Sequence, residues 1–385
     1  MIIEQYKNVI RAAESQNPVR GLTHNFYRYP ARFSHEFAAE VISCFSKPGD
    51  HVLDPFMGGG TAIVEALALG RCGTGVDLNE LAHFVASVKT TPLSQTDREV
   101  ILDWLSRYIG CDVSRARQGA GRVINLPYHI QRLFDGWLAR VDQLPEMRQR
   151  RFMRCALLNT GQRAIDCREQ IPAYPEIRLA LERNVSGMLI GLDELVQACQ
   201  ASGTAKNKIT VSRRLLCRSA VGIEKVAGLR NPERKVRLVV TSPPYYGVHV
   251  IYHRWQVKGR RETAAPYWIA SLNDGNPLSY YTFGSRRTQL GLTKYFDTLL
   301  GSFRSIREVM HQGGIVVQLV SFERTAEQLP RYLETMKLAG YRELDILVGE
   351  SGQRVWRNVP NRKWYSRNSE EHDSSKEVVL FHRAT

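Results

Sequence analysis

The sequence predicts an α/β protein with a doubly wound, mostly parallel sheet and a helical insertion. Three observations lead to this fold. A strand, a glycine turn, a helix and a second strand follow one another over residues 51–79, amphipathic helices occupy residues 93–205, and strand-like segments resume after residue 206. We therefore expect residues 1–92 and 206–385 to form one domain around a single sheet, with residues 93–205 inserted between its halves.

The individual elements follow from residue type and periodicity. "HVLD" (51–54) is typical of a short buried strand, and "TAIVEALALG" (61–70) of a helix that ends at Gly70. "GTGVDLN" (73–79) predicts the next strand. Apolar residues at helical spacing predict helices in the insertion, for example over 99–109, 129–141 and 187–200. Later strands are expected at 208–217, 237–242, 313–322 and 377–383, a helix at 294–310, and a solvated loop at 361–377.

Composition limits the function classes. A chain of 385 residues with 43% hydrophobic residues can bury a large core, as one large or two ordinary domains. Lys and Arg number 53 against 38 Asp and Glu, and this net charge of +15 favours a polyanionic partner such as nucleic acid without naming it. The seven cysteines form no CxxC pair, which indicates neither a zinc site nor disulfides and fits a reducing cytoplasm. No apolar run suggests a signal peptide or a membrane span, so a soluble protein is expected.

The glycine turn "DPFMGGGT" (54–61) lies between a strand and a helix, where glycines let the backbone approach a ligand. Its spacing matches neither GxGxxG nor GxxxxGK[ST], which argues against a nicotinamide dinucleotide or a nucleoside triphosphate. Asp77 ends the second strand, where an acidic side chain can accept hydrogen bonds from ribose hydroxyls. We interpret the pair as a site for a different nucleoside-containing ligand; the alternative is a tight strand-to-helix connection.

The segment "TSPPYY" (241–246) follows a buried strand, at the edge of the sheet where doubly wound folds place ligands. Two prolines fix the backbone and leave the carbonyl of Pro243 as an acceptor. Ser242 adds a second acceptor, and Tyr245 supplies a ring for stacking. This corner suits an aromatic ring that carries an exocyclic amine.

Both motifs together resemble the amino-group DNA methyltransferases, which use S-adenosylmethionine to modify N4 of cytosine or N6 of adenine. The family's motifs DPFxGxG and [D/N/S]PP[Y/F] are similar to Asp54–Gly60 and Ser242–Tyr245. "YRYPARF" (27–33) resembles its N-terminal motif and "SSKEVVLFHR" (374–383) its closing strand. The resemblance covers residues 24–92 and 206–385 and implies a sheet of the class I methyltransferase type.

The resemblance implies a set of site residues. Phe56 is expected beside the adenine of the cofactor, Asp54 on the cofactor or organising the turn, and Tyr29, Pro30 and Arg32 at the methionine end. The full set of expected cofactor-binding residues is Tyr29, Pro30, Arg32, Asp54, Pro55, Phe56, Gly58, Gly60, Thr61, Asp77 and Leu78. The expected catalytic residues are Ser242, Pro243, Pro244 and Tyr245.

The implied reaction aligns an amine with an activated methyl group, so it needs neither a cysteine nucleophile nor a metal. The target base is expected to rotate out of double-stranded DNA, stack on Tyr245, and donate its amine hydrogens to Ser242 and the carbonyl of Pro243. In this family, "TSPPY" is more typical of cytosine-N4 enzymes than of adenine-N6 enzymes. Cytosine is therefore favoured, with adenine as the alternative.

Residues 246–292 are basic and aromatic and are expected to form a long loop that contacts DNA. Its expected DNA-binding residues are Arg254, Lys258, Arg260, Arg261, Arg286 and Arg287. Trp255 is compatible with DNA stacking or with a core position. His249 and His253 lack a third ligand and are not interpreted as a metal site. Glu65 is expected to be a buried partner of nearby backbone groups.

The function that these features predict is a site-specific DNA methyltransferase of the bacterial or archaeal cytoplasm, alone or with a cognate restriction endonuclease. An RNA amine methyltransferase and a non-catalytic nucleic-acid-binding protein are the alternatives. Two interpretations of the helical insertion stay open: a target-recognition region, or a subdomain that braces the sheet or forms a dimer contact.

Overall fold

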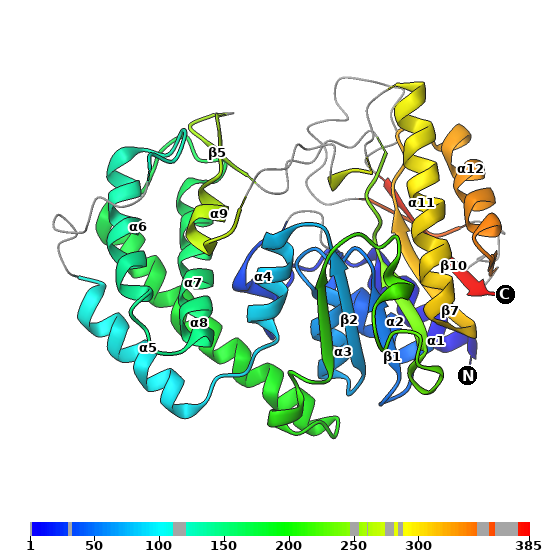
Figure 1. Cartoon of the computed structure of the whole chain (residues 1–385), viewed down its shortest axis with the longest axis horizontal. Helices are drawn as coiled ribbons and strands as arrows, with labels where there is room; N and C mark the ends of the chain where they lie inside the picture. The colour runs from blue at the N-terminus through cyan, green and yellow to red at the C-terminus, as the bar shows by residue number, and fades with distance from the viewer. Residues whose placement is uncertain are drawn as a thin grey trace.

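The structure is a computed structural model, and it describes residues 2–29, 33–110, 121–246, 254–259, 261–273, 281–283, 288–344, 354–358 and 376–385. The chain forms a large central sheet with helices on both faces and a further layer of helices beside it (Figure 1). The α/β fold with a mostly parallel sheet that the sequence predicts is confirmed.

The sheet has the strand order β3-β2-β1-β4-β7-β10-β8, and β9 also pairs with β10. Its strands are β1 (His51–Asp54), β2 (Cys72–Asp77), β3 (Arg213–Cys217), β4 (Val236–Thr241), β7 (Met310–Val320), β8 (Tyr341–Glu343), β9 (Trp356–Asn358) and β10 (Lys376–Ala384). Strands β3, β2, β1, β4 and β7 run parallel, whereas β10 is antiparallel to its neighbours. The chain builds outward from β1 in one direction and from β4 in the other. The switch point between β1 and β4 is where this class of fold places a ligand.

Alternating apolar residues bury both faces of the sheet. Val52, Leu238 and Val240 face a core formed with α1 (Ile2–Glu14), α2 (His35–Phe45) and α3 (Thr61–Ala68). Leu53 and Val239 point to the opposite core, formed with α11 (Gln289–Val309) and α12 (Thr325–Leu338). Neighbouring residues on one strand thus serve opposite layers, as expected for a doubly wound sheet.

A layer of helices lies beside the β3 edge of the sheet (Figure 1). It contains α5 (Gln95–Tyr108), α6 (Tyr128–Val141), α7 (Met147–Ile165) and α8 (Tyr174–Ala201), and α4 (Glu80–Lys89) connects it to β2 and β3. Its core is large and apolar. No helix among the described residues is long and apolar enough to cross a membrane. The described 3₁₀ helices are η1 (His24–Phe26), η3 (Lys206–Lys208), η4 (Ile223–Lys225) and η5 (Pro232–Arg234).

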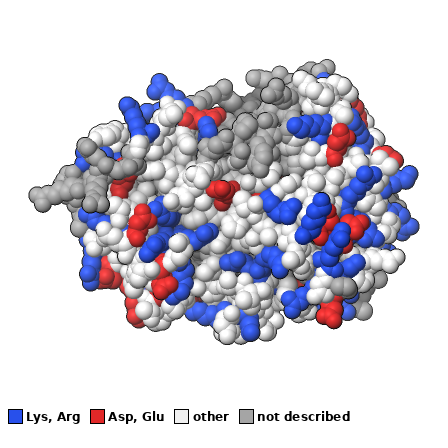
Figure 2. All heavy atoms as spheres, in the orientation of Figure 1, with Lys and Arg blue, Asp and Glu red and all other residues white. Residues whose placement is uncertain are grey.

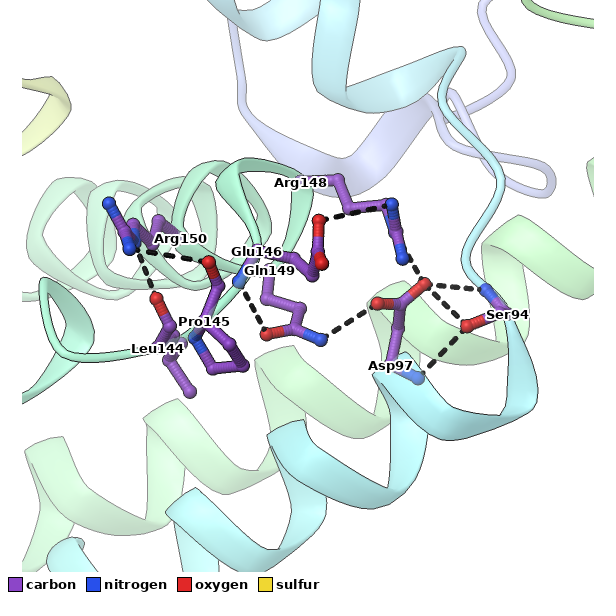
Figure 3. A network of polar contacts seen from close by, with 8 residues as sticks. All are labelled: Ser94, Asp97, Leu144, Pro145, Glu146, Arg148, Gln149 and Arg150. Carbon is purple, nitrogen blue, oxygen red and sulfur yellow. Dashed lines mark hydrogen bonds and ion pairs between the residues drawn. The ribbon is translucent and has the colours of Figure 1, made fainter.

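The first turns of α5 and α7 are joined by the carboxylate of Asp97 (Figure 3). One oxygen accepts from Arg148 Nε at 2.7 Å and from the Ser94 backbone amide at 2.8 Å, and the other accepts from Gln149 Nε2 at 2.8 Å. Burial alone would raise the pKa of Asp97, but these donors outweigh it and hold that pKa well below its usual range. The polar residues at this junction therefore serve the packing of helices.

The segment after the proline corner differs from the single long loop that its composition predicts. It contains the hairpin β5 (Trp255–Val257) and β6 (Arg261–Thr263), the helix α9 (Ala265–Ala270) and the start of α11. Trp255 is 1% exposed, and its Nε1 donates to the hydroxyl of Tyr27 at 3.0 Å. The core interpretation of Trp255 is therefore correct, because the hairpin and α9 bury their apolar residues in the helical layer.

Two other boundaries also differ from prediction. Residues 208–217 do not form one strand, because η3 ends at Lys208 and β3 begins at Arg213. The expected solvated loop 361–377 lies mainly outside the described residues, but Lys376 and Glu377 belong to β10 and Glu377 is buried. A charged composition hid the start of this strand, since Glu377 is stabilised inside by an arginine partner.

Candidate active site

A cavity opens at the carboxyl ends of β1, β2, β3 and β4, beside the switch point of the sheet. The glycine turn and the proline corner both line it, as the sequence predicts for a shared site. Of the expected residues, Tyr29, Pro55, Phe56, Gly58, Asp77, Leu78, Ser242, Pro243, Pro244 and Tyr245 line this cavity. Segments 160 residues or more apart in sequence thus meet at one place because the parallel strands end at one edge.

The glycine turn bends tightly beneath Tyr29. Gly58 has a φ of +46° and Gly60 a φ of +75°, which a residue with a Cβ rarely adopts. A Cβ on Gly58 would lie 3.2 Å from the ring of Tyr29, and one on Gly60 would lie 2.9 Å from the Cβ of Ala86. Lys89, which is buried, donates from Nζ to the carbonyl of Gly59 at 2.8 Å. The bend is therefore fixed from outside, and its cavity side stays open to a ligand.

Asp77 extends its carboxylate into the cavity at the end of β2. Its Oδ2 accepts from the amide of Gly58 at 2.9 Å and its Oδ1 from the amide of Asn79 at 2.8 Å. A carboxylate offers about four acceptor positions, so acceptor capacity remains for a ligand although the backbone amide of Leu78 also acts on this group. Burial raises the pKa of Asp77 to about 6, against the lowering effect of these amides. The group is ionised at neutral pH and suited to accept from two hydroxyls.

Asp54 has a different place, below the turn. Its Oδ1 accepts from Thr241 Oγ1 at 2.7 Å and from the amide of Phe56 at 3.2 Å, which ties the ends of β1 and β4 together. Burial raises the pKa of Asp54 to about 7. Within the described residues its Oδ2 is buried without a hydrogen-bond partner. Of the two expected roles, this geometry matches the organisation of the turn.

The proline corner presents Ser242 and the ring of Tyr245 to the cavity. Ser242 is partly exposed, and its Oγ lies 2.6 Å from the hydroxyl of Tyr245. Tyr245 is 6% exposed, because its hydroxyl reaches away from the corner toward β7 and β10. The carbonyl of Pro244 accepts from the hydroxyl of Tyr295 on α11 at 2.8 Å. The corner is therefore held in place by three other elements.

Aromatic side chains form one wall of the cavity. Phe56 is half-buried and contacts Phe283 edge-on, with 5.4 Å between the ring centroids, and Phe303 at 6.4 Å. Tyr281 and Phe283 also line the cavity. A flat heterocycle would find an apolar surface here beside the carboxylate of Asp77.

The other expected site residues either do not line the cavity or fall outside the described residues. Gly60 and Thr61 begin α3 and are not among the residues that line the cavity, and Pro30 and Arg32 lie outside the described residues. Of the expected DNA contacts, Lys258 and Arg261 are exposed at the β5–β6 hairpin and Arg254 is half-buried before it. Arg260, Arg286 and Arg287 lie outside the described residues.

The structure has a second hollow, which is polar. Two consecutive residues of the chain line the cavity and this hollow. Tyr29 lines the cavity, whereas Arg28 lines the hollow together with Arg163 and Arg168 from the end of α7. Lys258 is held nearby, because its amide donates to the carbonyl of Arg168 at 3.2 Å. Exposed cations from three segments therefore gather at this hollow, which Asp166 also lines at 4.0 Å from Arg28.

Glu65 is not among the residues that line the cavity. His249 and His253 lie outside the described residues, and the described part of the chain holds no group of three His, Cys, Asp or Glu that could bind a metal. Glu65 is buried as expected, but its partner is a side chain: His24 Nε2 lies 2.6 Å from Glu65 Oε1. The histidine comes from η1, far upstream, which local sequence could not indicate.

Sequence reasoning missed several cavity residues, namely Asn79, Arg218, Ser219, Ala220, Tyr281 and Phe283. Asn79 and Arg218 follow the ends of β2 and β3, and the rule that ligands meet strand carboxyl ends could have found them. Asn79 caps α4 through Leu81 and accepts from the hydroxyl of Tyr267 at 2.9 Å. That bond connects α9 to the rim of the cavity.

The fold and the cavity are those of an α/β protein with a site suited to a nucleoside-containing ligand. Comparison with known proteins indicates which class of α/β protein this is. The family model N6_N4_Mtase, described as DNA methylase, matches residues 4–116. Over this segment the chain is similar to the amino-group DNA methyltransferases that its motifs resemble. S-adenosylmethionine is the methyl donor that this family implies. The glycine bend, the aromatic wall and the acceptor oxygens of Asp77 fit such a ligand.

Curated relatives match over short segments. Type II methyltransferase M.MvaI of Kocuria varians is 32% identical over 109 residues, 28% of this chain and 24% of the relative. M.BsoBI of Geobacillus stearothermophilus is 37% identical over 68 residues, 17% of this chain and 13% of the relative. M.MjaII of Methanocaldococcus jannaschii is 27% identical over 85 residues, 22% of this chain and 16% of the relative. The matched part spans about a quarter or less of each relative.

Solved structures also show similarity. TrmN from Thermus thermophilus aligns with 94% of this chain and 53% of its own, at 13% identity and a TM-score of 0.33. A putative rRNA-methylase from Clostridium thermocellum aligns with 90% of this chain and 95% of its own, at 9% identity and a TM-score of 0.34. TM-scores this low support no conclusion about substrate.

Proposed function

We propose that the protein is a site-specific DNA methyltransferase that acts in the bacterial or archaeal cytoplasm on the exocyclic amine of a base rotated out of the duplex. Cytosine N4 is the favoured target and adenine N6 the alternative. One observation supports this function above the others: the glycine bend and the proline corner line a single cavity.

Three groups of the chain divide the work of binding. Asp77 accepts from the ribose hydroxyls of the methyl donor, Phe56 packs against its adenine, and Tyr29 closes over its methionine end. Bound S-adenosylmethionine supplies a methyl group that is already activated for in-line displacement. The protein therefore has to hold a nucleophile in line, and no covalent intermediate with the chain is required.

The proline corner holds that nucleophile. Ser242 and the carbonyl of Pro243 accept the two amine hydrogens of the base, which draws electron density toward the nitrogen, and the ring of Tyr245 stacks on the base. A buried, anchored Tyr245 favours this role, because its ring cannot turn away. Ser242 at the first position favours cytosine over adenine by resemblance to the family.

The cations beside the cavity support double-stranded DNA as the partner. Arg28, Arg163 and Arg168 line the polar hollow, and Lys258 lies next to it, where phosphates on either side of a rotated nucleotide would pass. Figure 2 shows Lys and Arg distributed over the visible face and interspersed with acidic residues. We infer local phosphate contacts here rather than one continuous basic strip.

The test is methyl transfer from tritium-labelled S-adenosylmethionine to unmodified genomic DNA and to RNA transcribed from it. Nucleosides are then identified by mass spectrometry. Formation of N4-methylcytosine in DNA supports the proposal, and N6-methyladenine supports the alternative base. Transfer to RNA alone, or no transfer by a protein that binds the cofactor, would overturn it. A Ser242→Ala variant provides the matched control for background transfer.

A further inference from the structure

Among the described residues, the hydroxyl of Tyr245 contacts one oxygen atom of the proline corner itself and two oxygen atoms behind it. Ser242 Oγ lies at 2.6 Å, Glu377 Oε1 at 2.8 Å and the carbonyl oxygen of Leu319 at 3.3 Å. Ser242 faces the cavity, whereas Glu377 is on β10 and Leu319 on β7, inside the sheet. A buried carboxylate is thus connected to the cavity through one hydroxyl group.

Glu377 is held as a carboxylate by Arg357. The residues Glu377 and Arg357 are 7% and 8% exposed, and Glu377 Oε2 lies 3.2 Å from Arg357 Nε. Arg357 Nη1 also donates to the carbonyl of Ala13 at 3.3 Å. A guanidinium stays protonated, and a buried cation needs an anion beside it, so the pair is ionic. An ionised carboxylate can only accept hydrogen bonds.

These partners determine the direction of the hydrogen bonds among Glu377, Tyr245 and Ser242. Tyr245 has one hydroxyl hydrogen, and both Glu377 and the Leu319 carbonyl can only accept it. At 2.8 Å and with a full charge, Glu377 is the stronger acceptor. The contact between Tyr245 and Ser242 must then use the hydrogen of Ser242. Ser242 consequently presents only lone pairs to the cavity.

We propose that Glu377 is a positioning residue that, through Tyr245, makes Ser242 an obligate hydrogen-bond acceptor and so selects an amine over a keto oxygen on the bound base. This inference rests on the proposed function. A lone serine hydroxyl can donate or accept and would tolerate either group. Because the hydroxyl of Ser242 donates its hydrogen to Tyr245, its oxygen accepts a hydrogen bond from an amine and repels a keto oxygen.

The test begins with Glu377→Gln. Arg357 carries only donors, so it attracts the amide oxygen of the new side chain and turns the amide nitrogen, a donor, toward Tyr245. Tyr245 can then give its hydrogen to Ser242, with the longer Leu319 contact as the weaker alternative. We expect kcat to fall about tenfold while KM for DNA stays within about twofold, since a charge-assisted bond is replaced by a neutral one.

A second substitution that restores activity distinguishes this mechanism from a general loss of activity caused by damage to the fold. Ser242→Asp supplies an acceptor whichever way the hydrogen of Tyr245 points. In wild-type protein it puts two carboxylates on one hydroxyl, but with Glu377→Gln it does not. We expect S242D to lower activity in the wild-type background and to raise it in the E377Q background. Equal loss in both backgrounds would overturn the proposal.

Glu343→Gln is the matched control. Glu343 on β8 is also paired with an arginine, Arg354, at 2.7 Å, but the hydroxyl of Tyr245 donates to Glu377 and not to Glu343. Its kcat should equal that of the wild type. Thermal unfolding with bound cofactor checks that each variant is folded. A fall in kcat for E343Q as large as for E377Q would refute a specific role for Glu377.

Infrared spectroscopy distinguishes failure of this inference from failure of the proposed function. The difference spectrum between wild type and E377Q should show loss of an ionised-carboxylate band, whether or not methyl transfer occurs. Loss of a protonated-carboxyl band instead would overturn the inference while leaving the function intact. Absence of methyl transfer by the wild type, with the ionised band present, would overturn the function alone.

Discussion

Asp77 and Asp97 each accept hydrogen bonds on both carboxylate oxygens, yet they belong to regions with different tasks. Asp77, at the edge of the sheet, accepts from two backbone amides and lines a cavity. Asp97, between α5 and α7, accepts from two side chains as well as from Ser94 and lines none of the described cavities. Burial raises the pKa of the first to about 6, while donors lower that of the second. Of these two carboxylates, the one that retains acceptor capacity lines the cavity, and the one with more donors joins two helices.

Removing Asp77 should produce the largest effect. In Asp77→Ala the two proposed hydrogen bonds to the ribose cannot form, and we expect affinity for S-adenosylmethionine to fall about 100-fold, with an intermediate loss for Asp77→Asn. Isothermal titration calorimetry measures both variants. If neither variant changed the affinity for S-adenosylmethionine, Asp77 would not bind the cofactor, and its difference from Asp97 would not be a functional one.

Acid should weaken the same interaction. Only the ionised carboxylate accepts from both hydroxyls, and burial raises the pKa of Asp77 to about 6. Affinity for the cofactor should therefore be constant at neutral pH and fall up to about tenfold per unit as the pH drops below about 6. The D77N variant should show a flatter profile, which separates Asp77 from Asp54. A wild-type profile as flat as that of D77N contradicts this assignment.

Asp97→Asn should have the opposite pattern of effects, lowering the stability of the protein and leaving its affinity for the cofactor unchanged. It weakens the charge-assisted bonds from Arg148 and Gln149, so we expect the free energy of unfolding to fall by about 1–3 kcal/mol. Urea denaturation measures this loss. Cofactor affinity at a temperature where the variant is folded should match that of the wild type, and a larger change in affinity than in stability would count against a purely structural role.

The smallest effect is expected at the surface beside the cavity. Lys258→Ala should lower the slope of log affinity for DNA against log salt by about one and leave cofactor binding unchanged. Lys337→Ala on α12, an exposed lysine near Glu334, is the control and should leave the slope unchanged. Fluorescence anisotropy over a salt series gives both slopes, and equal values would remove Lys258 from the interface.

Motifs and periodicity predicted the sheet and the two halves of the cavity because local residue patterns encode strands, turns and their carboxyl ends. They could not predict contacts between distant segments. The sequence around Trp255 does not indicate that this side chain contacts Tyr27 and Gly161. The charged sequence around Glu377 does not indicate a buried position, although its partner Arg357 lies on the neighbouring strand. His24 and Glu65 are another such pair. Long-range pairing of polar groups is decided by the fold.

The packing of Trp255 determines which segments of this protein have to be exchanged together in a chimera. A Cβ on Gly161 would lie 2.6 Å from the indole ring, so α7 and the hairpin after the proline corner are matched surfaces. A chimera that borrowed helices α5 to α8 from a relative would also have to borrow residues 255–270, although they lie on the far side of β4 in the chain. The natural unit of exchange is two separate stretches of sequence, which would have to be inherited together.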